Sequence, residues 1–532
     1  MNRINILLAS ILIISFSIRL YPTLLTGLPF STDSWPIIFN TETLLRYTPI
    51  NLEDNVFDGY NNYWPASQIF GAVSSIILDA RVLDVERILF PAIASLTPLI
   101  LYIMVKKAVG SRAAAIISSL LLALGGYQAI FTSGITKETF TLFLLFTYLY
   151  LVFATGGLAR RSILLFVTGM AIVMGHHLQY FLLLIILSNI LVLRLLLRRV
   201  YDNGPTRLTV ALTILVILGA AYYPLYALRG VYYSLTFSDA LSLISFQVVS
   251  LLILYYLLAG AKASKPPIGL FIAWAALYIC LFANQFIPVM PGSPKIPANL
   301  LIQVSILLML GFFVILGFHT SRQGEMVSSY FVLGWLSAMA SLEAYSMFGS
   351  QPSISLTLFY RLTNHILPPA LILASLGLVK VMSFFKRKCP GVLCLAVILL
   401  PISLTMVYQH YSSAILQENY LGYQWNYNIA EYEFASWLSG KADDLKVCGD
   451  MKVKYLLEGY FGIKVDEGEG FKILNGESPA GESLIVTYNV MEKNGYVLGP
   501  YGVELKQGWI KSISDRADKI FSNALVKAYS IG

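Results

Sequence analysis

Residues 87–153 read "RILFPAIASLTPLILYIMVKKAVGSRAAAIISSLLLALGGYQAIFTSGITKETFTLFLLFTYLYLVF". Three apolar segments follow one another here, and each approaches the roughly 20 residues that a helix needs to cross a bilayer. A basic segment, "KKAVGSR", separates the first from the second, and a polar one, "TSGITKET", separates the second from the third. The pattern predicts consecutive membrane-spanning helices at about 86–105, 113–131 and 138–156.

The same composition extends over most of the chain. Its 532 residues have a mean hydropathy of +0.69, and only 12% of them are charged. Soluble domains carry about twice that charged fraction. We therefore predict an α-helical polytopic membrane protein with about thirteen transmembrane helices. The predicted spans are 4–22, 86–105, 113–131, 138–156, 161–176, 178–197, 208–228, 240–261, 267–287, 298–318, 327–347, 366–385 and 391–409.

Basic residues set the expected orientation. They cluster after the even-numbered spans, so with Arg3 they all fall on one side, which the positive-inside rule makes cytoplasmic. The clusters are Lys106, Lys107 and Arg112; Arg160 and Arg161; Arg198, Arg199 and Arg207; Lys262 and Lys265; Arg322; and Lys386, Arg387 and Lys388. They also account for the net charge of +8, so no nucleic-acid partner is expected. The first span follows "MNR" with no clear cleavage site after it, and we expect it to be a retained anchor.

The composition changes near residue 411. The region to residue 532 carries ordinary charge; "AEYEFASWLSG" and "KVKYLLEGYFG" have helical patterns, while "LKVCGD" and "SLIVTYNV" have strand patterns. We predict a transmembrane domain at 1–410 and a small α/β domain at 411–532, which the odd number of spans would place outside the cytoplasm. The four cysteines form no CxxC motif, so neither disulfides nor a thiolate metal site is expected.

One acid, Asp33 in "GLPFSTDSWP", opens the long outer loop at 23–85. A carboxylate on the outer face, beside the membrane, can accept a proton from a nucleophile or hold a divalent cation. It can also simply cap a helix, because a proline follows at an early helical position. Stretches 36–48 and 66–82 of this loop have helix-compatible patterns.

Lys137 and Glu138 stand at the outer end of the span at 138–156, with Thr136 as the expected cap. An acid in the first turn is favoured by the helix dipole. Alternatively, the lysine could bind a phosphate while the acid orients a hydroxyl group.

Two further groups are predicted on the same side. His176 and His177 end the fifth span in "MGHHLQYF". Adjacent helical residues point about 100° apart, so these two would share a ligand only if the helix had ended. They are either satisfied polar groups or contacts to a phosphate or a sugar. Arg361 and His365 are spaced i, i+4 in the predicted outer loop 348–365, and an arginine among apolar residues there needs an anionic partner such as a lipid headgroup or a polyprenyl phosphate.

Other enzyme classes leave no signature. The chain has no Walker A, GxGxxG, HExxH or GxSxG motif in a fitting context. The predicted spans contain few ionisable residues, with Glu343 the main exception, whereas ion-coupled transporters usually need buried charges along a path.

The order of these features resembles the GT-C superfamily of integral membrane glycosyltransferases. Residues 1–200 carry a first span, an outer loop that opens with an acid, paired spans and a short second outer loop, and residues 87–153 are similar to spans 2–4 of that superfamily. The spans and the outward C-terminal domain look most like the catalytic subunit of oligosaccharyltransferase, particularly archaeal forms.

The resemblance implies roles for matching positions. Asp33 would be the first-loop acid, Glu138 would lie at the second-loop acidic motif, and Arg361 would match an arginine that contacts the lipid-linked phosphate. Lys137, His176, His177 and His365 are expected to join Arg361 around that phosphate. If a cation such as Mg²⁺ or Mn²⁺ is used, Asp33 and Glu138 would hold it.

Two departures guide the expected activity. The second loop reads "TKET" where oligosaccharyltransferases carry a DxD-like motif, and the tail has "YLGYQWNYN" in place of a WWDYG-type sequence. We therefore expect a cell-membrane glycosyltransferase that moves a sugar from a polyprenyl (dolichyl) phosphate to a glycan, lipid or protein acceptor. Inversion would follow from a single displacement, with Asp33 as the general base. The alternatives are an oligosaccharyltransferase-like enzyme and a flippase for a lipid-linked glycan.

Overall fold

The protein is described by a computed structural model. The described residues are 3–47, 57, 59–153, 157–197, 204–230, 236–259, 268–283, 286, 298–323, 329–349, 352–385, 391–414, 424–441, 446–499, 501–523 and 525–532. Residues 420–423 of the tail's aromatic cluster lie outside them, as do Arg198, Arg199, Lys262, Lys265 and the basic residues at 386–388. The predicted orientation in the membrane stays a prediction.

The chain divides into two compact units. The first comprises Met1–Ser15, Ser95–Ala129 and Thr141–Gln409, and the second comprises Phe16–Ala94, Ile130–Phe140 and His410–Gly532. These units are defined by contacts and not by the membrane, so the domain boundary predicted near residue 410 stays a prediction.

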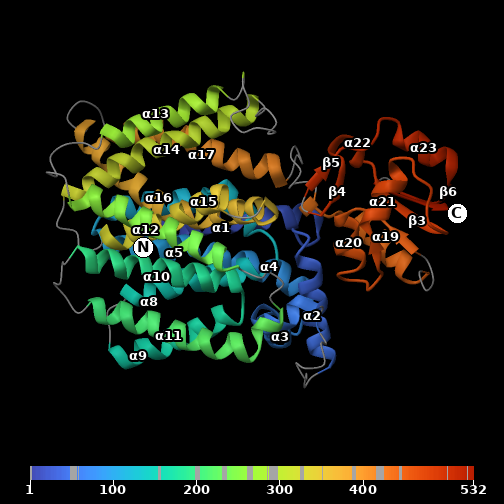
Figure 1. Ribbon diagram of the computed structural model, residues 1–532, viewed down its shortest axis with the longest axis horizontal. Helices are drawn as coiled ribbons and strands as arrows, with labels where there is room; N and C mark the ends of the chain where they lie inside the picture. The colour runs from blue at the N-terminus through green and yellow to red at the C-terminus, as the bar shows by residue number, and fades with distance from the viewer. Residues whose placement is uncertain are drawn as a thin grey trace. The chain divides into compact units, whose positions relative to one another are not determined.

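Helices dominate the first 414 residues (Figure 1). In chain order they are α1 (Arg3–Thr26), α2 (Ser34–Arg46), η2 (Gly59–Tyr63), α3 (Ala66–Leu78), α4 (Val82–Ser95), α5 (Thr97–Val109), α6 (Arg112–Leu124), α7 (Gly126–Phe131), α8 (Lys137–Phe153), α9 (Leu158–Val173), α10 (His177–Leu196), α11 (Gly204–Leu225), η3 (Ala227–Gly230), α12 (Phe237–Ala259), α13 (Ile268–Ala283), α14 (Ala298–Gln323), α15 (Ser329–Phe348), α16 (Pro352–Phe385) and α17 (Gly391–Ala414). Each predicted span overlaps one of these helices, and α2 and α3 confirm the helices expected in the first outer loop.

The helical, polytopic membrane class is confirmed. Among the described residues, eight helices are long and apolar enough to cross a bilayer. They are Arg3–Thr26, Val82–Val109, His177–Leu196, Arg207–Leu225, Phe237–Leu258, Leu301–Ser321, Tyr330–Phe348 and Arg361–Phe384. The predicted spans at 113–131, 138–156, 161–176 and 267–287 form the shorter helices α6, α8, α9 and α13.

The predicted outer loop 348–365 is largely helical, and its position outside the membrane stays a prediction. Helix α16 begins at Pro352 and runs for 34 residues, so it includes most of that stretch. Polar residues near Arg361 lower the local hydropathy, which led the sequence to predict a loop. Two of them, Asn364 and His365, are nevertheless buried at 1% and 0% exposure, so the helix continues through them.

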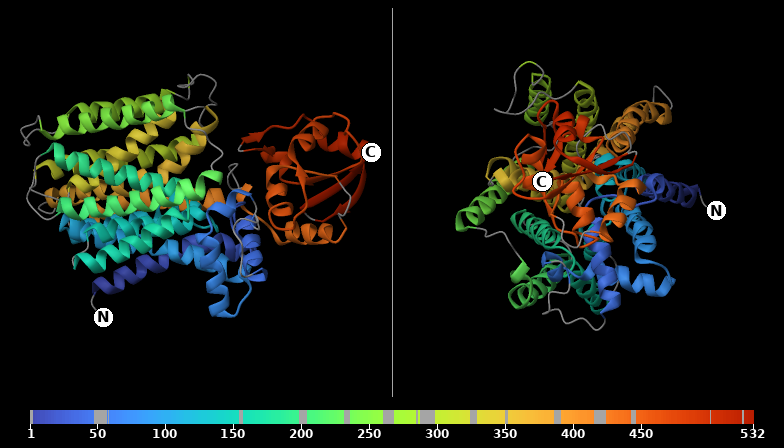
Figure 2. Two further views of the ribbon diagram at one scale, coloured as in Figure 1. Left: turned by 60° about the horizontal axis from the view of Figure 1, so that its bottom comes forward. Right: turned by 90° about the vertical axis from the view of Figure 1, so that its right-hand side faces the viewer.

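Close helix packing holds the first unit together, and its long helices lie alongside one another (Figure 2, left). Helices α14 and α16 approach so closely that a Cβ on Gly317 would overlap the carbonyl oxygen of Leu373. Small residues permit such approach where lipid supplies no hydrophobic drive. Polar side chains also link helices: Asn189 Nδ2 donates to Gln247 Oε1 at 2.9 Å, and the hydroxyls of Ser250 and Ser337 lie 2.8 Å apart.

The tail forms the predicted α/β fold. Its elements are α19 (Ile429–Ser439), β1 (Lys446–Cys448), α20 (Met451–Leu457), β2 (Val465–Asp466), α21 (Glu467–Leu474), β3 (Ser483–Tyr488), α22 (Met491–Asn494), β4 (Tyr496–Leu498), β5 (Tyr501–Val503), α23 (Trp509–Arg516), β6 (Asp518–Ser522) and β7 (Val526–Ile531). The helices at α19 and α20 and the strands β1 and β3 confirm the four patterns found in the sequence.

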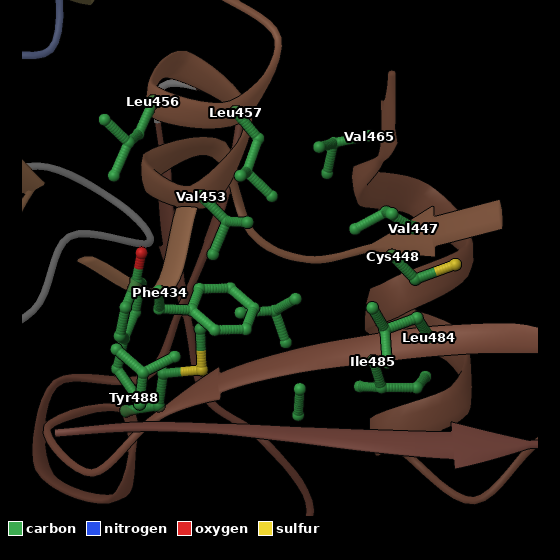
Figure 3. Close-up of a cluster of buried hydrophobic side chains, with 14 of the residues drawn as sticks. Phe434, Val447, Cys448, Val453, Leu456, Leu457, Val465, Leu484, Ile485 and Tyr488 are labelled. Carbon is green, nitrogen blue, oxygen red and sulfur yellow. The ribbon is translucent and has the colours of Figure 1, made fainter. Parts of the chain in front are cut away.

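A mixed sheet organises the tail's core. Its strand order is β2-β1-β3-β7-β6, in which β1 pairs in parallel with β2 and β3, and β7 runs antiparallel to β3 and β6. Every residue of β3 is buried, as expected for a central strand covered on both faces. Figure 3 shows side chains of α19, α20 and the sheet meeting in this core, among them Phe434, Leu457 and Ile485.

The packing of α14 on α16 gives a first prediction. In Gly317→Val the new side chain overlaps the α16 backbone, and overpacking of this kind costs about 1–3 kcal/mol or more. We expect a lower midpoint in thermal unfolding of the detergent-solubilised protein, followed by size-exclusion chromatography. Gly269→Val in α13 is the matched control, because a Cβ added at Gly269 would have open space around it within 4 Å. Equal midpoints for the two variants would contradict the close approach.

Candidate functional site

Asp33 precedes α2 at the end of a sharply turned loop. Ser31, two residues earlier, has φ +86°, a left-handed conformation that is unusual for a residue with a side chain. Asp33 itself is half-buried and has helical angles, φ −63° and ψ −15°. An N-cap needs an extended conformation for its side chain to reach the first free amides. Asp33 makes no such hydrogen bond, so the capping interpretation of this acid is wrong.

The loops that carry the predicted acids are joined. The amide of Ile135 donates to Ser34 Oγ at 3.0 Å, and Ser34 Oγ donates to the Phe30 carbonyl oxygen at 2.6 Å. Beside this bond, a Cβ on Gly134 would lie 2.5 Å from Ser31 Cβ. The residue next to Asp33 is therefore bonded to a loop that leads directly into Lys137 and Glu138.

The start of α8 is fixed by threonines. The amide of Thr139 donates to Thr136 Oγ1 at 2.9 Å, which confirms the predicted cap. Thr139 Oγ1 in turn donates to the Gly134 carbonyl oxygen at 3.0 Å, so the loop is closed on itself. Lys137 and Glu138 occupy the first turn and are buried, with 6% and 9% of their surfaces exposed. A buried lysine and a buried acid side by side are equipped to bind charged or hydroxylated groups.

A buried arginine near these loops was missed in the sequence. Arg19, in α1, is 0% exposed, and its Nε donates to Thr132 Oγ1 at 2.8 Å. His410 lies close to it and is also buried. Ionisable residues inside an apolar helix are rare and usually functional. The sequence could have indicated this residue, because "SFSIRLYP" places one arginine within the first apolar segment.

The tail packs against α2 through aromatic rings. Trp35 is fully buried, and its ring lies 5.2 Å from Tyr427, 5.8 Å from Tyr432 and 5.5 Å from Tyr460, measured between centroids. The hydroxyl of Tyr460 donates to Glu42 Oε1 at 3.3 Å. Burial raises the pKa of Glu42, although this bond opposes the shift.

A buried ion pair lies next to Tyr427, one of the rings in this aromatic contact. Lys452 Nζ lies 2.6 Å from Glu431 Oε1, and both residues are almost fully buried. Glu431 also accepts from the amide of Asn428 at 2.8 Å, which completes a capping box at α19. Tyr427 donates to the Lys452 carbonyl oxygen at 3.0 Å. Burial raises the pKa of Tyr427 far above its usual range, and the nearby carboxylates of Glu431, Asp450 and Asp33 add to the shift.

The predicted histidines lie in the first unit. α9 ends at Val173, and His176 is extended, with φ −162°, before α10 begins at His177. The first of the two helices has thus ended before both histidines, which is the condition under which both rings could reach one ligand. Their ring centroids are 5.0 Å apart. His365 Nε2 lies 3.0 Å from Gln179 Nε2, and both residues are fully buried.

Arg361 stands one turn before His365 within α16, as its spacing predicted. It is partly buried. Two residues further along α16, Thr363 Oγ1 donates to Glu343 Oε1 of α15 at 3.3 Å. The structure thus groups Asp33, Lys137 and Glu138 in the second unit, and groups the histidines with Arg361 in the first.

The predicted residues do not line the cavity found on the tail. Within the described part of the chain, no cluster of three or more histidine, cysteine, aspartate or glutamate side chains could hold a metal ion. A cavity of about 630 Å³ lies on the tail and is lined by Lys446, Lys454 and Lys464 with Asp466 and Glu467. Lys446 pairs with Glu469, and Lys454 lies 3.9 Å from Glu467, so the charges of this cavity are largely balanced.

Comparison with known proteins identifies the class of fold. No protein-family model and no curated protein sequence matches the chain. Among solved structures, the chain is similar to the archaeal oligosaccharyltransferase AglB from Archaeoglobus fulgidus, in complex with an inhibitory peptide and a dolichol-phosphate. The TM-score is 0.53 and the sequence identity is 13%. The alignment covers 91% of this chain and 69% of that chain. ArnT from Cupriavidus metallidurans, bound to undecaprenyl phosphate, aligns with a TM-score of 0.43 and 10% identity over 99% of this chain and 97% of that one.

The chain has a GT-C-like fold, which confirms the resemblance seen in the sequence. At this level of identity the likeness concerns the fold.

The buried ion pair gives a second prediction. Lys452→Met leaves Glu431 buried without its cation, and breaking such a pair costs about 3–5 kcal/mol. We expect a clear fall in the midpoint of thermal unfolding of the full chain. Lys446→Met is the matched control, because the Lys446 side chain is 42% exposed and ion pairs of a solvent-exposed lysine are worth about 0–1 kcal/mol. Equal effects of the two substitutions would contradict the buried pair.

Proposed function

We propose that this protein is a membrane glycosyltransferase that moves a sugar from a polyprenyl-phosphate donor to an acceptor on the outer face of the cell membrane. One observation carries the proposal: a GT-C-like fold in which the Asp33 loop is bonded to the loop that leads into Lys137 and Glu138. The AglB structure, which has this fold, holds a dolichol-phosphate. The proposed topology places the N-terminus in the cytoplasm and the tail outside.

The proposed reaction is a single displacement. An acceptor oxygen attacks the anomeric carbon, and the bond from that carbon to the phosphate oxygen breaks. The polyprenyl phosphate departs with the bonding electron pair, and the configuration inverts. Asp33 accepts the proton of the acceptor hydroxyl, because a half-buried carboxylate at a loop end can reach both the solvent side and the substrate. Positioning and charge neutralisation supply the rest of the rate enhancement.

The neighbouring residues have distinct proposed roles. Glu138 orients the acceptor, and Lys137 neutralises the departing phosphate, because both are held in the first turn of α8 beside the Asp33 loop. Arg361, His176, His177 and His365 are further candidates for the phosphate on the strength of the sequence. If a divalent cation such as Mg²⁺ or Mn²⁺ is used, Asp33 and Glu138 would hold it, and it would supply positive charge to the departing phosphate.

A second candidate is transfer of a lipid-linked glycan to protein, which the likeness to an oligosaccharyltransferase favours. The two functions are separated by their acceptors. Transfer to an asparagine-containing peptide that EDTA abolishes and Mn²⁺ restores would support the second candidate. Movement of the donor across vesicles without covalent transfer would support a flippase in place of either enzyme.

Asp33→Asn gives a third prediction. The amide cannot accept the proton, so transfer of radiolabelled sugar from polyprenyl phosphate should fall by roughly 100- to 10,000-fold. Donor binding should remain, since the substitution conserves size. Asp79→Asn is the matched control: Asp79 lies in the same outer loop, is exposed and has φ +47°, which asparagine tolerates. Undiminished transfer by Asp33→Asn would remove Asp33 as the base.

A further inference from the structure

A short segment of the tail contacts both loops of the candidate site. Trp425 stands in this segment, and its ring meets Phe30 of the Asp33 loop edge-on, at 6.0 Å between centroids. The same ring meets Phe131, the last residue of α7 and the one directly before the second loop, at 4.9 Å and 84°. Phe30, Ile130 and Ala414 form a buried cluster against it. One side chain of the tail therefore packs on both loops.

The backbone of Trp425 holds the strained residue of the first loop. Its carbonyl oxygen accepts a hydrogen bond from the amide of Ser31 at 2.8 Å. The left-handed conformation of Ser31 costs about 1–2 kcal/mol for a residue with a side chain, so it persists only where other contacts fix it. Because Asp33 follows two residues later, the angle of Ser31 determines where its carboxylate points.

The segment is itself anchored on both sides. Asn426 Nδ2 donates to the Ala414 carbonyl oxygen at 2.8 Å, at the end of α17. Tyr427 packs on Trp35, which lies two residues after Asp33. Trp425 is thus fixed between the tail's core and the end of α17. Because its own position is fixed, its contacts can hold the two loops in place.

We propose that Trp425 is a positioning residue for Asp33, Lys137 and Glu138. It touches no reacting atom; it clamps the loop that carries Asp33 to the loop that leads into the other two, through one ring and one carbonyl group. The tail then contributes to the chemistry by holding the site in shape. This inference rests on the proposed function, because its kinetic effect is measured as sugar transfer.

The test compares three variants of the full-length chain with the wild type. Trp425→Ala removes the ring, Trp425→Phe keeps an aromatic ring, and Trp437→Ala is the matched control. Trp437 is also a tail tryptophan in ring contact, but its ring packs within the tail, against Phe521 at 4.8 Å. We expect kcat for transfer to fall roughly 100-fold in Trp425→Ala, the scale of a misplaced reacting group, with KM for the donor changed less than about threefold. Trp425→Phe should recover most of kcat, and Trp437→Ala should retain it.

Hydrogen exchange supplies a readout that does not depend on activity. The amides of Ser31 and Ile135 are both hydrogen-bonded in this clamp. In Trp425→Ala, peptides covering 28–36 and 130–137 should exchange faster, while peptides from β3 should not change. A merely structural role in the tail would instead raise exchange in β3.

A second substitution approaches the clamp from the other loop. Gly134→Ala places a Cβ 2.5 Å from Ser31 Cβ and 2.6 Å from the Phe30 carbonyl oxygen, so the loops must separate. It should lower kcat and raise exchange in the same two peptides, and it decides the question if Trp425→Ala fails to fold. Wild-type kcat or unchanged exchange in these variants would overturn the inference. If the wild type transfers no sugar, the proposed function fails, and exchange alone decides whether Trp425 clamps the loops.

Discussion

The bilayer imposes the constraint on which this structure depends. Within hydrocarbon, every backbone amide and carbonyl group must find its partner inside the protein, and an α-helix does this within one segment. The long apolar segments therefore become helices regardless of their neighbours. Close approach at Gly317 and hydrogen bonds such as Asn189 to Gln247 then hold the helices against one another.

Contacts between loops bring together the candidate site residues of the second unit. Ser34 and Ile135 are joined by one hydrogen bond, and Trp425 packs against both of their loops. Asp33, Lys137 and Glu138 are brought into one region by these contacts, although long apolar helices separate them along the chain. The aromatic contact of Trp35 with the tail strengthens this arrangement, so the tail is part of the framework that carries the acids.

Particular residues show how far the sequence could predict the structure. The cap at Thr136, the helix spacing of Arg361 and His365, and the strands β1 and β3 follow from patterns of a few neighbouring residues, and they were predicted correctly. The extension of α16 back to Pro352 was not predicted, although Asn364 and His365 are buried within it. The cap at Asp33 was not predicted correctly either: that residue has helical angles and follows a left-handed turn at Ser31, whose amide is bonded to the distant Trp425.

The sequence by itself determined the class of this protein: a helical membrane protein with an α/β tail, in which helices and strands follow from local apolar patterns. It also indicated Asp33, Lys137 and Glu138 as candidate site residues, because charged residues beside a membrane are costly and therefore rare. Only the tertiary structure decided which polar groups meet. The bond between Ser34 and Ile135 joins residues 101 positions apart, and contacts at that separation arise from the packing of the whole chain, which no local pattern encodes.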